Sequence, residues 1–560
     1  KKAIGAGFLL ERNAEYRTKR VREYSEKIGN DKEGSFGGYH QEKEIINGVE
    51  TWTGWTTNEF ESLDIKDIEK LAKAKGIADY NITTVTTPVN PVNFKRIEDK
   101  DVDQNADVGG VSLIGNKDMK LEATEVLPLA LYSLSSVLKC QGYEVSIIDP
   151  CEFVYLDEKE NAETTCVTLI EECLEEGYDI VGFSVNTFNW GITKTVVNQI
   201  SWKKNTTVVL GGLHVSVFDE YSLLTTKADI IMRGEGELTW CELVATLKNV
   251  APLDTIKGIT YKSGKNIIRN PDRGAMTIED LEALPLPDYE LLPIDNPYVE
   301  MPVESSRGCQ FSCSFCSIPH RHNWRGLCEI QVIERVKHAK RHMKNIMRGG
   351  NILFVDDCFS MHPKRAIKIL DALHKCYGEE MKYFIEARIS NILSGEFLEG
   401  FQRNLISQMQ IGVECGYDEG LKKIKKGLTI AQLYKGLRII EEKGLSSVAN
   451  LSFIIGFPWE DFGTIEKTLD TVEYIVNRFG ILCRVNWFML LPSDIWWERK
   501  KYGINVESDI YDNPSWRYDT DIFYSTNPLI SEEEINRIEK RIKLIYACTK
   551  KISYNRTFAI

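Results

Sequence analysis

The segment ESSRGCQFSCSFCSIPH, residues 304–320, places three cysteines within eight residues. They follow the spacing C-x3-C-x2-C and are Cys309, Cys313 and Cys316. Three thiolates on one loop can reach one small cubane cluster, and its fourth iron then stays open for a chelating ligand such as the amino and carboxylate groups of a methionine. Zinc is the alternative, because it also binds three cysteines and a fourth ligand, and His320 and His322 lie close by.

The residues around and after this loop alternate between short apolar segments and helical patterns. The order of strand then helix predicts a full or partial (β/α) barrel over residues 300–490, with its chemistry at the carboxyl ends of the strands. We expect strands at 302–308, 351–357, 383–389, 409–416, 446–458 and 483–492. Residues 491–560 are aromatic and charged, end in a long helix from Ser531, and are predicted to form a substrate-side or lid region.

A second α/β pattern precedes the cysteine loop. Apolar strands at 107–115, 143–149, 179–185, 206–212 and 228–234 alternate with amphipathic helices. This alternation predicts a doubly wound, Rossmann-like domain over residues 106–250, with a ligand at the carboxyl ends of its strands. Residues 251–299 are rich in proline towards their end and are predicted to be a mostly extended connector. No role follows from the sequence of residues 1–105.

Composition restricts the kind of protein. The chain has 560 residues, 43% hydrophobic and 27% charged, with a net charge of −13, which lacks the basic excess that favours nucleic-acid binding. The sequence has no run of about 18 uncharged apolar residues, so no membrane span is predicted. The apolar patch at 3–10 is short for a signal peptide, so we expect a cytoplasmic protein. In a reducing compartment the 14 cysteines are expected to be metal ligands, catalytic groups or buried thiols.

Several motifs resemble those of the radical S-adenosylmethionine (SAM) superfamily, in its elongator-protein/MiaB-type core. The cysteine triplet is followed in order by FVDDCF (354–359), EARIS (386–390), IGVECGYDEGLKKIKKG (411–427) and IIGFPWED (454–461). The resemblance implies that the three cysteines hold a [4Fe–4S] cluster.

The same resemblance implies SAM contacts, which follow the family motifs position by position. Phe315 would pack near the adenine or the cluster. Asp356 or Asp357 would contact the methionyl amino group, and Arg388 would pair with its carboxylate, which a guanidinium fork suits. Further contacts are implied at Glu414, for the ribose or methionyl group, and at Gly456, Phe457 and Pro458, for the adenine.

The upstream domain resembles the cobalamin-binding domain of cobalamin-dependent radical SAM enzymes. Four ordered segments carry this likeness: LPLALYSLSSVLKCQGYEVSIIDP (127–150), DIVGFSVNT (179–187), VVLGGLHVS (208–216) and ADIIMRGEGE (228–237). Glycine pairs at a strand end allow a bulky ligand to approach the backbone. The predicted cobalamin-binding residues are Ser184, Val185, Asn186, Thr187, Gly211, Gly212, Leu213, His214, Gly234, Glu235 and Gly236. The alternative is a vestigial domain that binds nothing.

One departure from methionine-synthase-type cobalamin domains concerns the lower face of the cobalt. The string D-x-H-x-x-G is absent, and His214 follows the glycine pair without an aspartate two residues earlier. We therefore expect cobalamin with its own base displaced and no histidine on cobalt. His214 is predicted to contact the nucleotide loop or to support other residues.

The two resemblances together imply a cobalamin-dependent radical SAM C-methyltransferase. Such an enzyme methylates an unactivated carbon through a 5′-deoxyadenosyl radical and methylcobalamin, and it needs an external flavodoxin- or ferredoxin-like electron donor. The substrate, whether a natural-product precursor, a lipid, a peptide or a protein residue, cannot be read from the motifs. Ring closure, ring contraction or oxidation with the same cofactors is the main alternative. A cobalamin-binding sensor without catalysis is a further one, against which the cysteine triplet argues.

Overall fold

The computed structural model describes most of the chain from residue 127 onward and a few short strands before it. The described ranges are 2–9, 35–36, 39–40, 43–46, 49–52, 127–149, 162–175, 177–249, 251–292, 300–318, 320–343, 351–393, 396–399, 405–549 and 551–555. One compact unit holds residues 1–10, 115–152 and 160–560, and a second holds 11–114 and 153–159. The described strands of the second unit form two antiparallel pairs: β2 (Ser35–Phe36) with β3 (Tyr39–His40), and β4 (Lys43–Ile46) with β5 (Val49–Trp52).

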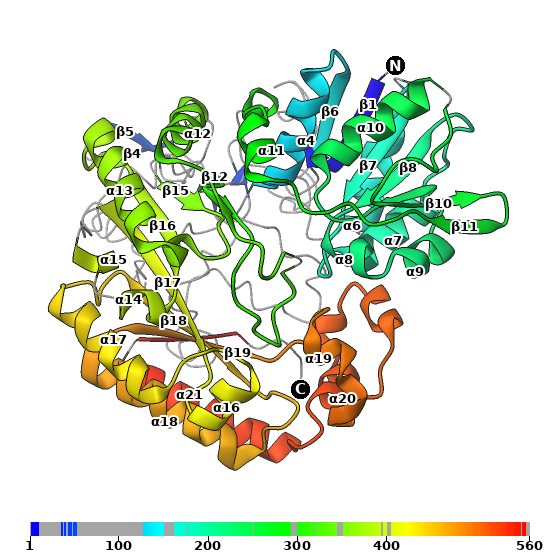
Figure 1. Cartoon of the computed structure of the whole chain (residues 1–560). Coiled ribbons are helices and arrows are strands. Elements are labelled where there is room, and N and C mark those ends of the chain that lie inside the picture. Colours follow the sequence, from blue (N-terminus) through cyan, green and yellow to red (C-terminus); the bar gives the residue numbers. More distant parts are fainter. Residues whose placement is uncertain are drawn as a thin grey trace. The chain divides into compact units, whose positions relative to one another are not determined.

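The first sheet of the larger unit has seven strands in the order β11-β10-β9-β8-β7-β1-β6 (Figure 1). Five of them are parallel: β1 (Lys2–Leu9), β6 (Glu144–Asp149), β7 (Ile180–Ser184), β8 (Thr207–Gly211) and β9 (Ile230–Met232). Helices alternate with the strands, as a doubly wound fold requires: α4 (Leu129–Lys139), α6 (Ala162–Glu175), α7 (Trp190–Gln199), α8 (Leu213–Val217), α9 (Asp219–Thr225) and α10 (Glu237–Lys248).

This sheet contains two features that the strand pattern did not reveal, one in its interior and one at an edge. Strand β1, from the apolar start of the chain, lies between β6 and β7, with Ala3 paired in parallel to both Val145 and Ile180. The strand predicted at 107–115 lies outside the described residues. The hairpin of β10 (Ile259–Ser263) and β11 (Asn266–Arg269) extends the sheet antiparallel to β9, within the stretch predicted to be a connector.

The second sheet is an open, all-parallel sheet in the order β12-β15-β16-β17-β18-β19-β20. It confirms the partial (β/α) barrel that the sequence predicted. Its strands are β12 (Met301–Val303), β15 (Asn351–Phe354), β16 (Lys382–Ala387), β17 (Ile406–Glu414), β18 (Ala449–Ile455), β19 (Leu482–Trp487) and β20 (Ile552–Asn555). The last strand, which follows the long C-terminal helix, escaped the sequence reading.

Helices cover one face of this sheet (Figure 1). The main ones are α12 (Glu329–His342), α13 (Pro363–Tyr377), α17 (Ile430–Glu442), α18 (Phe462–Phe479) and α21 (Glu532–Thr549). In β16 and β19 buried residues such as Tyr383, Ile385 and Val485 alternate with less buried polar ones such as Glu386 and Arg484. Because side chains of a strand alternate between faces, the helix-covered face is apolar and the opposite face is polar.

The segment after β19 packs against the first sheet's helices. Its short helices are α19 (Asp494–Trp497), η8 (Ser508–Asp512) and α20 (Thr520–Thr526). Asp512 accepts hydrogen bonds from Trp190 Nε1 at 2.8 Å, from Lys194 Nζ at 2.5 Å and from the Tyr221 hydroxyl at 2.5 Å. One carboxylate thus ties this segment to α7 and α9. None of the helices described is both long and apolar enough to span a bilayer.

Candidate functional site

The cysteine loop, residues 308–324, lies between two short paired strands, β13 (Ser306–Arg307) and β14 (Arg325–Gly326). Gly308 has φ +85°, and a Cβ there would lie 2.2 Å from the carbonyl oxygen of Asn323, so the turn into the loop requires glycine. Cys309 is fixed by its backbone, which donates to the His320 carbonyl at 3.3 Å and accepts from the His322 amide at 2.6 Å.

All three cysteines of this loop are unpaired thiols, two of them buried and Cys316 partly so. Burial raises the pKa of Cys316 to about 11 and also raises the pKa of Cys309. Burial thus favours the protonated form of Cys309 and Cys316, and a metal must displace these protons in order to bind. Arg388 approaches from β16's end, with its Nη1 3.7 Å from the Cys313 sulfur and its guanidinium 3.7 Å from the centroid of the Phe311 ring.

The donor set fits an iron–sulfur cubane, which takes three thiolates from one loop and leaves one iron open. Among the described residues, no three Cys, His, Asp or Glu side chains converge as a single metal ion needs. Zinc requires each thiolate sulfur at about 2.3 Å from the metal, so the three must converge tightly. The nearby His320 contacts Glu235, with 3.7 Å between Nε2 and a carboxylate oxygen.

The adjacent aspartates after β15 have different surroundings. Asp356 is buried and accepts from the Ser305 amide at 2.7 Å and from the Ser305 and Ser306 hydroxyls at 2.6 and 2.5 Å. Its oxygens are therefore committed to the chain's own turn. Asp357 is more exposed, and burial together with Asp356 raises its pKa to about 6. Of the two predicted candidates, Asp357 has the carboxylate better placed to meet a ligand.

Arg388 and Glu414 are brought near one another through Lys426. Arg388 Nη2 donates to the Lys426 carbonyl at 2.5 Å, and Lys426 Nζ donates to Glu414 at 3.0 Å. Glu414 ends β17 with φ +75°, an uncommon backbone state for a residue other than glycine and one that recurs at functional sites. A Cβ at Gly412 would lie 2.2 Å from the Glu414 carboxylate and 2.9 Å from Lys426 Nζ, so glycine there makes room for this ion pair.

The Gly456-Phe457-Pro458 turn follows β18, and neighbouring side chains fix its conformation. Gly456 has φ +77°, and a Cβ there would lie 2.5 Å from the Trp487 ring. Glu460 accepts from the Phe457 amide at 2.9 Å and from the Tyr417 hydroxyl at 2.8 Å. The rings of Phe315 and Phe457 meet edge to face, with centroids 6.1 Å apart. The turn therefore contacts the cysteine loop through these two rings.

The carboxyl edge of the first sheet is built from backbone. Gly212 has φ +116°, and a Cβ there would lie 2.4 Å from the Val185 carbonyl oxygen, so this position needs glycine for the chain's own packing. At Gly211 the nearest atoms to a Cβ would belong to Met232, with its Cε at 3.4 Å and its carbonyl oxygen at 3.7 Å, which are ordinary contacts. Both glycines are partly exposed. This edge fits a bulky cofactor that approaches backbone, as the cobalamin prediction requires.

The polar residues after β7 are used in the loop itself. The Asn186 side chain accepts from the amides of Phe188 and Asn189 at 2.8 and 3.0 Å and so caps the turn. Ser184 offers its carbonyl to the Asn189 side chain at 3.1 Å. Thr187 is buried, with its hydroxyl 3.4 Å from His214 Nδ1. These contacts hold residues 184–189 in the loop at the end of β7.

His214 lies on α8, one residue after Leu213, and has no exposed surface. Its ring stacks on Trp190 with centroids 4.8 Å apart and meets Tyr511 edge to face at 5.5 Å. Burial lowers its pKa to about 3, although Asp512 opposes the shift. The ring is therefore neutral at physiological pH and sits in an aromatic core.

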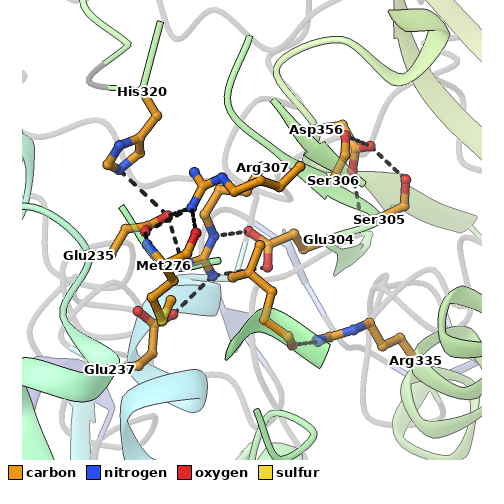
Figure 2. Close-up of polar contacts among 12 residues, drawn as sticks. Glu235, Glu237, Met276, Glu304, Ser305, Ser306, Arg307, His320, Arg335 and Asp356 are labelled. Carbon is orange, nitrogen blue, oxygen red and sulfur yellow. Dashed lines mark hydrogen bonds and ion pairs between the residues drawn. The ribbon is translucent and has the colours of Figure 1, made fainter. Parts of the chain in front are cut away.

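The turn after β9 contains Gly234, Glu235 and Gly236. Gly234 has φ +77° and donates its amide to the Ser216 hydroxyl at 3.0 Å, which joins this turn to α8. The Glu235 carboxylate accepts from Arg325 at 2.9 Å and from the Met276 amide at 2.6 Å. Its charged partners are thus residues at the base of the cysteine loop (Figure 2).

Several residues of this region were not predicted. Lys426 had a signal in the sequence, since it lies within the quoted 411–427 motif. Glu386 lies near the end of β16, two residues before Arg388, and burial together with Glu414 raises its pKa to about 8. Asp494 had no signal, because its contacts with Arg321 at 2.6 Å and Lys425 at 3.3 Å join three distant segments.

Comparison with protein families matches two parts of the chain. Residues 303–472 match the radical SAM superfamily, and residues 123–244 match the B12 binding domain. An uncharacterized methyltransferase of Pyrococcus horikoshii is 30% identical over 353 residues, which cover 61% of this chain and 72% of that protein. The anaerobic magnesium-protoporphyrin IX monomethyl ester cyclase of Rubrivivax gelatinosus is 26% identical over 335 residues, 56% of each protein.

Among solved structures, the radical SAM methyltransferase TsrM of Kitasatospora setae, with cobalamin and a [4Fe–4S] cluster bound, has a similar fold. The TM-score is 0.55 at 15% identity, and the match covers 69% of this chain and 78% of that one. The cofactors of the family are a [4Fe–4S] cluster, SAM and cobalamin. The chain thus belongs to the radical SAM superfamily, among the enzymes that carry a B12-binding domain ahead of the radical SAM domain.

Proposed function

We propose that this enzyme is a C-methyltransferase that transfers a methyl group from SAM to an unactivated carbon of its substrate. One observation carries the proposal: the turn at the predicted cobalamin edge is in direct contact with β14, the strand that follows the loop with the three thiols, through Glu235 and Arg325. An enzyme that uses both cofactors in one reaction needs their two sites in register.

In this proposal the residues divide by task. Cys309, Cys313 and Cys316 hold the cluster, which when bound supplies the electron that cleaves SAM to methionine and a 5′-deoxyadenosyl radical, while cobalamin supplies the methyl carrier. Asp357 binds the methionyl amino group and Arg388 its carboxylate. Glu414 orients the ribose, and the turn at Phe457 covers the adenine. These contacts hold SAM in one orientation and exclude water from the radical.

At the other edge, Gly211 and the partly exposed backbone beside it leave space for the corrin. His214 is unsuitable as a cobalt ligand because its ring is buried between Trp190 and Tyr511. The proposal therefore keeps cobalamin with its base displaced and without a histidine on cobalt. The other partners proposed are an external electron donor and a substrate that is not a nucleic acid.

The names of relatives support methylation and also define the alternative. The Pyrococcus protein and TsrM are described as methyltransferases, whereas the Rubrivivax relative is a cyclase. A cyclisation or oxidation that uses the same cofactors is therefore the second candidate. We propose a reducing, cytoplasmic location, because cluster ligands must remain thiolates and the cysteines in the described segments are unpaired.

The substrate-free reaction separates the two candidates. Reconstituted protein with hydroxocobalamin, a strong reductant and SAM should form about one equivalent of S-adenosylhomocysteine per cobalamin, since a methyltransferase charges its carrier before substrate arrives. Omission of cobalamin should abolish that product while 5′-deoxyadenosine still forms. Release of 5′-deoxyadenosine with no S-adenosylhomocysteine, in the presence of cobalamin, would reject methyl transfer and favour the second candidate.

A further inference from the structure

The base of the cysteine loop contains two arginines that face each other across a strand pair. Arg307 in β13 is directly opposite Arg325 in β14, and the two strands are the start and the end of the loop. Like charges in directly opposed positions destabilise a strand pair, more so when buried. The side chains of Arg307 and Arg325 are only 17% and 7% exposed. Carboxylates must therefore neutralise them.

Two of the neutralising carboxylates come from the B12-binding domain (Figure 2). Glu235 accepts from Arg325 Nη1 with both oxygens at 2.9 Å and from Arg307 Nη1 at 3.4 Å. Glu237, the first residue of α10, accepts from Arg307 Nη2 at 2.9 Å. Within the barrel, Glu304 accepts from Arg307 at 2.7 and 3.0 Å. In the described residues, Arg325 thus has Glu235 as its one carboxylate partner.

Glu235 is committed to this contact. Its side chain is 4% exposed. Although burial alone raises the pKa of Glu235, Arg325, the Met276 amide and Arg307 outweigh that effect and lower it, so the carboxylate is charged at neutral pH. Charged hydrogen bonds of this kind, once desolvated, are strong, and removal of one partner leaves the other charge unpaired.

The same turn continues into the predicted cobalamin edge. The amide of Gly234 binds the Ser216 hydroxyl at 3.0 Å, and that hydroxyl also donates to the Gly212 carbonyl at 2.7 Å. Two residues, Ser216 and Gly234, therefore connect Gly212 to Glu235, whose carboxylate binds the strand pair at the base of the cysteine loop.

We propose that Glu235 is a positioning residue that couples the two cofactor sites: cobalamin bound at the glycine edge fixes, through Glu235, the arginine pair at the base of the cysteine loop and so strengthens SAM binding. Coupling of this kind is reciprocal, so SAM strengthens cobalamin binding by the same factor. When a first ligand has already ordered an element that affects both sites, the second ligand binds without the entropic cost of ordering it. The proposal requires both cofactors but not methyl transfer, so it can fail while the proposed function stands.

The test measures the dissociation constant of SAM by equilibrium dialysis. The reconstituted enzyme, with its cluster oxidised so that no turnover occurs, is titrated with and without saturating hydroxocobalamin. The wild-type enzyme should bind SAM about five-fold or more tightly with cobalamin, the lower range of typical coupling. Glu235→Gln keeps the size of the side chain but removes its charge. In this variant the ratio of the two SAM dissociation constants, without and with cobalamin, should fall below about two, because the charged contact between Glu235 and the arginine pair is lost.

Asp219→Asn is the matched control. Asp219 is also a buried carboxylate of the B12-binding domain that binds two arginines, at 2.8 Å to Arg269 Nε and 3.5 Å to Arg233 Nη1, and in the part of the chain that the structure describes its ion pairs do not involve the cysteine loop. It should keep the wild-type ratio even if it lowers stability. A wild-type ratio near one, or a Glu235→Gln ratio equal to that of the wild type, would overturn the proposal.

A second variant covers the case in which Glu235→Gln does not fold. Glu235→Gln with Arg325→Gln removes both members of the pair and leaves no unpaired charge, so folding is expected to return. The ratio should still be below about two, because the connection itself is missing. A folded double variant that keeps the wild-type ratio would show that the coupling runs through other contacts, and would equally overturn the proposal.

Discussion

The two cofactor edges of this enzyme are built by opposite means. At the barrel edge the proposed site is made of charged side chains: Arg388 donates to the backbone carbonyl of Lys426, and the Lys426 ammonium group pairs with Glu414. At the edge of the first sheet, backbone defines the site, through Gly211 and Gly212, while the ionisable side chain of His214 is buried in the core. A small polar ligand needs charges in fixed places, whereas a broad macrocycle needs space.

This difference predicts that the barrel edge is sensitive to the loss of functional groups. Replacement of Cys309, Cys313 and Cys316 together by alanine should abolish 5′-deoxyadenosine formation from SAM and reductant, because no electron reaches the sulfonium. Cys358→Ser is the control, since Cys358 is a buried thiol that packs against Cys309 but lies outside the loop. Retained cleavage in the triple variant, or its loss in the control, would remove the assignment of the cluster.

The other edge should be sensitive to volume, and its two glycines to different degrees. Gly212→Ala places a Cβ 2.4 Å from a backbone oxygen at φ +116°, so the variant should lose about 2 kcal/mol or more of stability, a fall of about 5 °C in melting temperature. In Gly211→Ala the nearest atom to the new Cβ is the Met232 Cε at 3.4 Å, an ordinary contact, so this variant should melt within about 1 °C of the wild type. Equal melting temperatures for the two variants would contradict this reading of the edge.

A smaller effect tests geometry rather than charge at the barrel edge. Arg388→Lys keeps the positive charge but loses the planar fork that reaches Lys426, Cys313 and the Phe311 ring. SAM should bind roughly ten-fold more weakly, about 1.4 kcal/mol. Arg478→Lys, which alters a surface pair with Glu441, should leave the affinity unchanged. If both variants bind SAM like the wild type, Arg388 does not contact it.

The smallest effect concerns His214. Its pKa of about 3 in the folded protein lies below the ordinary 6.5, so the unfolded chain binds more protons, and stability is lost as the pH falls from about 6.5 towards 3. Between pH 6.5 and 5.5 this loss is about 1 kcal/mol. In His214→Phe, which keeps an aromatic ring beside Trp190, melting temperature should fall less over that interval. An identical fall in both proteins would place His214 in contact with solvent.

The features that depend on short segments of the chain could be predicted from the sequence. The cysteine spacing, the alternating strands and helices and the glycine turns predicted the family, the cofactors and both sheets, because each signal lies within a short segment. Features that depend on partners far away in the sequence could not be predicted in this way. β20 joins the barrel sheet only through β19, and β1 enters the first sheet between strands more than 130 residues further along the chain.

The same limit applies to single side chains. The motif containing Glu235 predicted a cobalamin contact, yet the carboxylate's partners, Arg325 and Arg307, are 90 and 72 residues away. The sequence does not distinguish the neighbours Asp356 and Asp357, whereas in the structure Asp356 is buried against the backbone amide of Ser305 and the hydroxyl groups of Ser305 and Ser306 and Asp357 is more exposed. Local patterns identify a strand-end loop, but the partners of its side chains lie in distant segments and cannot be predicted from the sequence of the loop.

The most direct test of two separate cofactor sites on one chain is the iron and cobalamin content of three proteins after anaerobic reconstitution with hydroxocobalamin. The wild type should contain about four irons and one cobalamin. The triple cysteine variant should lose the iron and keep cobalamin. Gly211→Phe, which fills the space at the glycine edge, should lose cobalamin and keep the iron. Retention of iron without the three cysteines, or of cobalamin in Gly211→Phe, would contradict the account.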